Sequence, residues 1–178
     1  KINFSEIQAR KNKIIQQLRQ GMEFMLGGID FLNAEARILS NNTVGVGKRE
    51  INTKFILIAT GSKPQQLTDI KFDGKRIISS DEILNLKEIP NSLLIIGGGV
   101  IGCEFASLFS ALGCQVSVVE LMPQLLPGID KEIAKKLETV FKKKGIKIAA
   151  NTDAKSLDFT HYDLVLLCIG RTPATEDM

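Results

Sequence analysis

The sequence predicts an α/β fold with a parallel sheet, preceded by a smaller part that contains a helix and antiparallel strands. Three observations predict this fold class. A short apolar run at 93–96 meets a cluster of glycines, and apolar residues then recur at helical spacing before a β-branched run at 115–119. Further continuous apolar runs at 55–59 and 163–169 indicate strands buried on both faces. Between residues 29 and 54 the hydrophobic period is two, as in antiparallel strands.

The glycines after the first run have the spacing G-x-G-x-x-G, at Gly97, Gly99 and Gly102. Between a strand and a helix, this spacing is typical of a Rossmann-like dinucleotide site. The first glycine permits the turn, the second lets backbone approach a pyrophosphate, and the third lets the helix pack closely on the strand. The phosphates then lie at the helix N-terminus, where free N–H groups favour an anion. Glu120 ends the second strand, where an acid that hydrogen-bonds a ribose 2′-hydroxyl is expected.

The loop at 121–128 contains no Lys or Arg that could receive a 2′-phosphate, so the sequence favours NAD over NADP. Two alternatives to a nucleotide site exist. The glycines could serve packing alone in a Rossmann-like unit. Residues 93–113 are also apolar enough to suggest a membrane span, but the glycine turn and the charged Glu104 argue against one.

In chain order, an amphipathic helix is expected at residues 5–26. Ser5 and Gln8 have the spacing of a capping box, which marks its start. Its expected inner face carries apolar side chains at helical spacing: Ile7, Ile14, Ile15, Leu18, Met22 and Met25. Turn residues then divide 29–54 into an antiparallel meander. Its expected segments lie around 29–32, 36–39, 43–46 and 49–53.

The apolar run at 55–59 (FILIA) predicts a buried parallel strand. It ends in a small-residue turn, Thr60-Gly61-Ser62, at the carboxyl end of a strand, where ligands of open α/β sheets bind. A polar connection at 62–78 follows, and then a short helix over 81–86 that Ser80 is expected to cap.

The remaining elements complete the parallel sheet. Asp130 is expected to cap a helix that Gly145 ends, and a third strand follows at 146–149. Residues 163–169 are the last buried strand.

The composition limits the possible functions. A net charge of +3, with 24% charged residues, gives no electrostatic case for a nucleic acid or a membrane as partner. Cys103, Cys114 and Cys168 lack metal or disulfide spacing, so we expect core residues in a reducing, cytoplasmic compartment. The start of the chain carries no signal-like segment, and the sequence suggests a piece of a longer protein.

Several stretches together resemble one family, the flavin- and pyridine-nucleotide-dependent disulfide oxidoreductases, and within it the dihydrolipoamide dehydrogenase branch. They occur in the family's order: IATGSKP at 58–64, SSDEILNLKEIP at 79–90, IIGGGVIGCEFAS at 95–107, VVELMPQLLPGID at 118–130 and LLCIGRTPAT at 166–175. The resemblance implies a partial FAD-binding domain at 1–78, an NAD-binding Rossmann domain at 79–170 and a return segment at 171–178. The meander near 151–162 is shorter than the family usually has.

The resemblance also implies roles for particular residues. Glu104 matches an acid near the nicotinamide and flavin, although a helix acid that serves only the dipole explains it equally well. The residues expected at the NAD site are Gly97, Gly98, Gly99, Val100, Ile101, Gly102, Glu104, Val119, Glu120, Ala154 and Gly170. Those expected to contact FAD are Ala36, Thr60, Gly61 and Ser62.

The chain departs from the family at the catalytic groups. It lacks the C-x-x-x-x-C dithiol and the H-x-x-x-x-E pair, and its only histidine, His161, is expected in a surface loop. We therefore expect no catalytic residue and no metal site in this chain. In the parent enzyme, dihydrolipoamide on a lipoyl domain of a 2-oxo acid dehydrogenase or glycine cleavage complex would be oxidised through FAD by NAD, in a homodimer.

Three other functions remain open on the sequence. The chain could belong to another NADH-coupled flavoprotein, such as an NADH oxidase or a CoA-disulfide reductase. It could be a non-catalytic NAD-binding or sensing module. It could also be a structural Rossmann scaffold.

Overall fold

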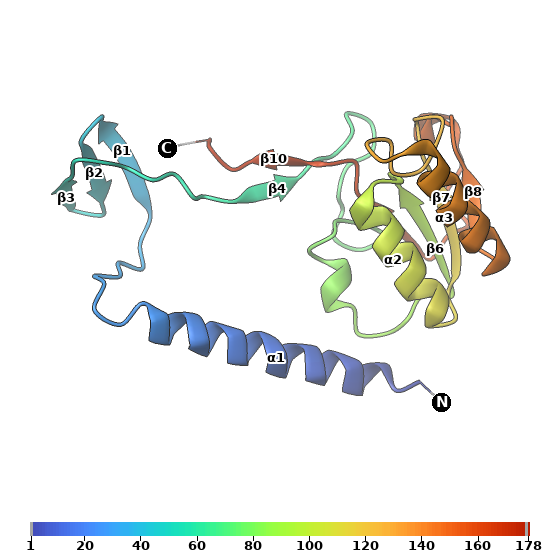
Figure 1. Ribbon diagram of the computed structural model, residues 1–178, viewed down its shortest axis with the longest axis horizontal. Coiled ribbons are helices and arrows are strands. Elements are labelled where there is room, and N and C mark those ends of the chain that lie inside the picture. Colours follow the sequence, from blue (N-terminus) through green and yellow to red (C-terminus); the bar gives the residue numbers. More distant parts are fainter. Residues whose placement is uncertain (1, 177) are drawn as a thin grey trace. The chain divides into compact units, whose positions relative to one another are not determined.

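The computed structural model describes residues 2–176 and 178, and these form two compact units (Figure 1). One unit contains Lys1–Gln8 and Pro64–Thr172, and the other contains Ala9–Lys63 and Pro173–Met178. The chain therefore starts in the first of these units, passes into the second, returns to the first and ends in the second.

The unit with residues 64–172 is built on a five-stranded parallel sheet in the order β5-β9-β6-β7-β8. Its strands are β5 (Ile77–Ile78), β6 (Ser92–Ile96), β7 (Gln115–Val119), β8 (Lys147–Ala149) and β9 (Leu164–Leu167). Helix α2 (Val100–Ala111) connects β6 to β7, and α3 (Lys131–Lys143) connects β7 to β8 (Figure 1). The parallel α/β fold and the βαβ unit predicted from the sequence are confirmed.

Side chains of the sheet alternate between two apolar layers because successive strand residues point to opposite faces. On one face, Leu93 and Ile95 pack with Phe109 of α2 and Phe141 of α3. The opposite face carries Leu94, Ile96, Val119, Val165 and Leu167. Both faces are thus buried, which explains why β6 and β9 are continuously apolar in the sequence.

The helix ends follow the expected signals. Asp130 caps α3 by accepting hydrogen bonds from the amides of Glu132 and Ile133 at 2.9 and 3.3 Å. Gly113 and Gly145 end α2 and α3 with φ angles of 92° and 81°, a conformation that glycine adopts without a steric cost.

The polar connection predicted at 62–78 contains structure that the sequence did not indicate. Ile70 is buried on the second face of the sheet, with Leu67 and Phe72 packed beside it, and β5 adds a strand to the sheet. Apolar residues spaced irregularly in a loop give no periodic signal, so their burial was missed.

The short helix after β5 is also smaller than predicted. A 3-10 turn, η1, covers Ile83–Asn85, and Ser80 does not cap it. No side chain among the described residues caps η1; in the turn before it, the Ser79 hydroxyl accepts from the Asp81 amide at 3.2 Å, and the Glu82 carboxylate accepts from the Ser79 amide at 2.6 Å. Two adjacent serines offer the same signal, and only the backbone geometry selects one.

Helix α1 (Phe4–Met25), most of which belongs to the other unit, precedes an antiparallel meander of β1 (Ala36–Ser40), β2 (Thr43–Val46) and β3 (Arg49–Asn52). Residues 29–32 do not form the expected strand. Asn3, rather than Ser5, caps α1 by accepting from the Glu6 amide at 3.4 Å. None of the residues of α1 is buried, so its expected inner face lies exposed in the structure.

The prediction of a buried parallel strand at 55–59 is wrong. The run is not a strand, and Phe55 and Leu57 are 88% and 90% exposed. Among the described residues, no strand pairs with this run, and a strand needs such a partner to bury its backbone. Next to it, β4 (Ser62–Pro64) pairs with β10 (Arg171–Pro173) in a two-stranded sheet.

The three cysteines are free thiols and are buried, as the sequence predicts. Burial raises the pKa of Cys103 and of Cys114 to about 11, and that of Cys168 to about 12. The thiols therefore stay protonated at neutral pH.

We expect Gly97→Ala to lower the free energy of unfolding by about 2 kcal/mol or more. Gly97 has a φ of 110°, and a Cβ there would lie 2.4 Å from the Cys168 carbonyl oxygen. Gly99→Ala is the matched control, because its φ is −71° and no atom lies within 4 Å of the new Cβ. Urea unfolding of the three proteins measures the difference. Equal stability of the two variants would contradict the packing described here.

We also expect alkaline pH to destabilise the fold through its thiols. The Cys114 thiol ionises at 9.0 ordinarily but at about 11 when folded, so stability present below pH 9 is lost as the pH rises toward 11. Each such thiol contributes at most about 1.4 kcal/mol per pH unit. Urea unfolding at about pH 8 and about pH 10, with reductant, should show a smaller loss in Cys114→Ala than in wild type. The same loss in both proteins would refute this account.

Candidate nucleotide-binding cleft

The glycine turn joins β6 to α2 at the carboxyl edge of the parallel sheet. Gly97 donates its amide hydrogen to the Val119 carbonyl at 2.8 Å, which ties the turn to β7. A Cβ on Gly102 would lie 2.0 Å from the Gly97 carbonyl oxygen, so only glycine allows α2 this close to the turn. Gly97, with a φ of 110°, therefore makes the turn, and Gly102 allows the close packing of α2, which are the roles expected of the first and third glycines.

The middle glycine has a different surrounding. Gly99 is the residue before α2, no side chain caps the helix there, and a Cβ at Gly99 would meet no atom within 4 Å. The first amides of α2 have no partner within the helix and the positive end of the dipole lies here. The free amides and the positive dipole end beside Gly99 therefore suit a phosphate group.

Glu120 follows β7 and is buried, with 8% of its surface exposed. One carboxylate oxygen accepts from the Gly98 amide at 2.6 Å, and the other accepts from the Met122 amide at 2.8 Å. The carboxylate is thus held rigidly between the glycine turn and the loop after β7. Its remaining lone pairs can accept hydrogen bonds from a ligand hydroxyl.

These groups line one cleft with a volume of about 580 Å³. Ala154 and Gly170 reach it from two other loops, after β8 and β9, because the carboxyl ends of parallel strands meet at one edge. Of the residues expected at the NAD site, the structure brings eight to this cleft: Gly97, Gly99, Val100, Ile101, Val119, Glu120, Ala154 and Gly170.

The other three expected residues do not line it. Gly98, within the turn, packs against the next loop, because a Cβ there would meet Leu125 at 2.5 Å. Gly102 packs against the backbone of the turn. Glu104 is exposed on α2. Gly98 and Gly102 therefore allow close packing around the turn, and Glu104 is not among the residues that line the cleft.

The cleft also has walls that the sequence did not indicate. Leu67, Thr152, Asp153 and Ile169 line it, and Leu67 comes from the connection before β5. The apolar residues of that connection indicated that part of it could be buried. The neighbouring sequence did not indicate that they lie at the edge of this sheet.

The four residues expected at FAD all lie in the other unit and are exposed. Ala36 begins β1, where it pairs with Val46, and Ser62 begins β4. Thr60 lies in an extended segment, and Gly61 has a φ of 77°. The described residues do not enclose these positions, so this chain does not by itself fit a flavin there.

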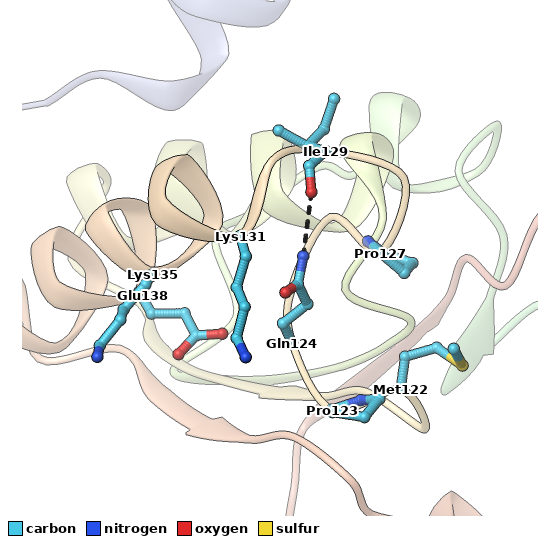
Figure 2. Close-up of a pocket in the computed structure, with 8 residues that line it drawn as sticks. All are labelled: Met122, Pro123, Gln124, Pro127, Ile129, Lys131, Lys135 and Glu138. Atoms are coloured by element: carbon cyan, nitrogen blue, oxygen red, sulfur yellow. Dashed lines mark hydrogen bonds between the residues drawn. The ribbon is translucent and has the colours of Figure 1, made fainter.

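A second cavity of about 620 Å³ shares Met122 and Pro127 with the cleft (Figure 2). Lys131, Lys135 and Glu138 of α3 also line it, and Figure 2 shows Lys131 beside Gln124 of the loop after β7, Lys135 pointing away from that loop, and the Glu138 carboxylate between the two lysines. The Glu138 carboxylate accepts from the Leu125 amide at 3.1 Å, which secures the loop. The loop itself lacks cations, but the fold brings these two lysines beside it.

Two general findings limit the class of site. Within residues 2–176 and 178, no helix has the length and apolar character that a membrane crossing needs. The same residues contain no cluster of three or more His, Cys, Asp and Glu side chains that could hold a metal ion.

Comparisons with known proteins agree with this geometry. A dihydrolipoyl dehydrogenase of Bacillus subtilis (strain 168) is 33% identical over 198 residues, which is 99% of this chain and 43% of that protein. A second dihydrolipoyl dehydrogenase of the same strain is 38% identical over 174 residues, or 89% of this chain and 36% of that protein.

Among solved structures, the Cu(II) complex of the HOCl-induced flavoprotein disulfide reductase RclA from Escherichia coli matches with a TM-score of 0.86 and 30% identity. The match covers 99% of this chain and 44% of that one. The chain thus spans less than half the length of the relatives it matches.

The family model described as pyridine nucleotide-disulphide oxidoreductase matches residues 2–178. The members named above are oxidoreductases, and the E. coli protein is by name a flavoprotein disulfide reductase. Since the match covers nearly the whole chain, this confirms the resemblance noted in the sequence: the chain belongs to the pyridine nucleotide-disulphide oxidoreductase family.

Proposed function

We propose that this chain is the NAD(H)-binding part of a dihydrolipoyl dehydrogenase. One observation carries the proposal: the open space at Gly99 and the rigid carboxylate of Glu120 line the same cleft. A dinucleotide needs a diphosphate site and a ribose site in one cleft at the carboxyl edge of the sheet. The names of the relatives, which are dihydrolipoyl dehydrogenases, support the choice of enzyme.

The residues of this chain would bind and orient the coenzyme. The α2 N-terminus would hold the pyrophosphate, and Glu120 would accept hydrogen bonds from the adenosine ribose. Ala154 and Gly170, from the loops after β8 and β9, would contact the remainder of the coenzyme. The bound NAD⁺ supplies the chemistry, which is acceptance of a hydride.

The whole protein would carry out the full reaction. FAD and a redox dithiol would pass electrons from dihydrolipoamide to NAD, and the lipoamide would arrive on a lipoyl domain of a 2-oxo acid dehydrogenase or glycine cleavage complex. A homodimer is the proposed assembly. The other assignments are an NADH oxidase, a CoA-disulfide reductase or a non-catalytic NAD-binding module, which would share the same cleft.

NADP is the second candidate coenzyme, and Lys131 and Lys135 favour it. Both line the second cavity, which shares Met122 with the cleft, and two lysines could neutralise a 2′-phosphate that reaches into it. Glu120 opposes this assignment, because its buried carboxylate would repel a phosphate on the ribose it faces.

Glu120→Gln tests the coenzyme assignment. We expect the dissociation constant of NADH to rise about tenfold or more, because a charge-assisted hydrogen bond to the ribose becomes neutral and because one of the two backbone amides that Glu120 holds, at Gly98 or Met122, loses its acceptor. The preference for NADH over NADPH should shrink, because the repulsive charge is gone. Fluorescence titration of both coenzymes measures this.

Glu132→Gln is the matched control, since Glu132 is exposed on α3 and outside the cleft, and its loss changes the net charge equally. A wild-type chain that binds neither coenzyme would overturn the proposed function. An unchanged ratio in Glu120→Gln would overturn the role of this carboxylate.

We further expect the purified chain to bind NADH weakly, to retain little or no flavin and to show no lipoamide turnover. Its cysteines, at 103, 114 and 168, do not form the C-x-x-x-x-C dithiol, and the residues expected at FAD are exposed. A visible absorbance scan and a dihydrolipoamide assay check this. A yellow, active preparation would contradict it.

A further inference from the structure

Two buried thiols bond to the backbone of the glycine turn, and one of them, Cys168, also lines the cleft. Cys168 follows β9, and its Sγ donates to the Gly97 carbonyl oxygen at 3.4 Å. Cys103, in the first turn of α2, donates through its Sγ to the Gly98 carbonyl oxygen at 3.4 Å. Two successive carbonyls of the turn are thus each held by a thiol from a different element.

The surroundings keep both thiols as donors. Cys103 is 6% exposed and Cys168 is 9% exposed. Burial raises their pKa values to about 11 and about 12, so each carries its hydrogen at neutral pH. The neutral thiol is the only form that can donate to a carbonyl.

Fixing a carbonyl also fixes the amide on the other side of the same peptide. The described residues contain no cis peptide bond, so the C=O of one residue and the N–H of the next point in opposite directions. Holding the Gly98 carbonyl on Cys103 and on the Leu126 amide, at 2.8 Å, therefore turns the Gly99 N–H away from the protein interior. That direction leads into the cleft, which Gly99 lines.

The same argument applies one peptide earlier. The Gly97 carbonyl is held by Cys168, and the opposite end of that peptide, the Gly98 N–H, meets the Glu120 carboxylate at 2.6 Å. The second thiol thus orients the amide that braces the ribose-binding acid.

We propose that Cys103 and Cys168 are positioning residues for a dinucleotide: Cys103 holds the Gly98–Gly99 peptide with the Gly99 amide toward the diphosphate, and Cys168 holds the Gly97–Gly98 peptide with the Gly98 amide on the Glu120 carboxylate. The proposal rests on the proposed function of the cleft. It adds that the turn is not preorganised by its glycines alone.

Binding measurements on Cys103→Ala, Cys168→Ala and the double variant test this. We expect the dissociation constants of NADH and ADP-ribose to rise about threefold for each single variant and about tenfold for the double one. Adenosine, which carries the ribose but lacks the diphosphate, should bind to Cys103→Ala with unchanged affinity, whereas Cys168→Ala should weaken adenosine as well because it loosens the amide that holds Glu120. The Ser variants should restore most of the affinity, because a hydroxyl donates to the same carbonyl.

Cys114→Ala is the matched control. Cys114 is equally buried, but its Sγ bonds the Gln115 carbonyl at the opposite end of β7, away from the turn. It should lose stability without losing diphosphate affinity. NADH binding by the double variant at wild-type strength, or an equal loss of NADH and adenosine affinity in Cys103→Ala, would overturn the proposal.

A measurement without ligand separates this inference from the proposed function. In amide NMR spectra, the Gly98 and Gly99 signals should broaden or exchange faster in the double alanine variant, and should stay unchanged in Cys114→Ala. Unchanged signals in the double variant overturn the positioning role. Failure of the wild-type chain to bind NADH would instead overturn the coenzyme assignment.

Discussion

The structure depends on one close approach of backbone to backbone, where α2 leaves β6. The Cys168 carbonyl, the Gly97 carbonyl and the start of α2 meet at distances that leave no room for a Cβ on Gly97 or Gly102. Because of this contact, α2 aims its N-terminus at the sheet edge, next to the ends of β7 and β9. The cleft, the position of Glu120 and the surroundings of Gly99 all follow from it.

The central βαβ unit could be predicted from the sequence because its signals are local. The apolar run of β6, the glycine spacing and the β-branched run of β7 each specify their own element, and they occur in consecutive order. The run at 55–59 is just as continuously apolar, yet the strand predicted there is not formed. A strand buried on both faces exists only with neighbours on both sides, and the described chain offers it none. The same reason explains the exposed apolar face of α1.

The candidate site was predictable where one stretch of chain builds it and not where the fold assembles it. Gly99 and Glu120 belong to the βαβ unit and were identified by spacing alone. Leu67, Lys131 and Cys168 come from other elements, and their positions depend on the strand order, which sets β9 beside β6. Gly98 was assigned to the ligand by its place in the motif, yet its amide is bonded to Glu120.

The exposed run at 55–59 has a consequence for the chain in solution. Five uncharged residues of high β propensity, without proline and fully accessible at Phe55 and Leu57, have the composition of a segment that self-associates into intermolecular sheets. Lys54 and Lys63 flank it, and such charges oppose the stacking of identical copies. Lys63 is engaged with Glu176, however, which leaves Lys54 as the more effective gatekeeper. Aggregation of the isolated chain should therefore begin at this segment and increase with salt, which screens the lysine charge.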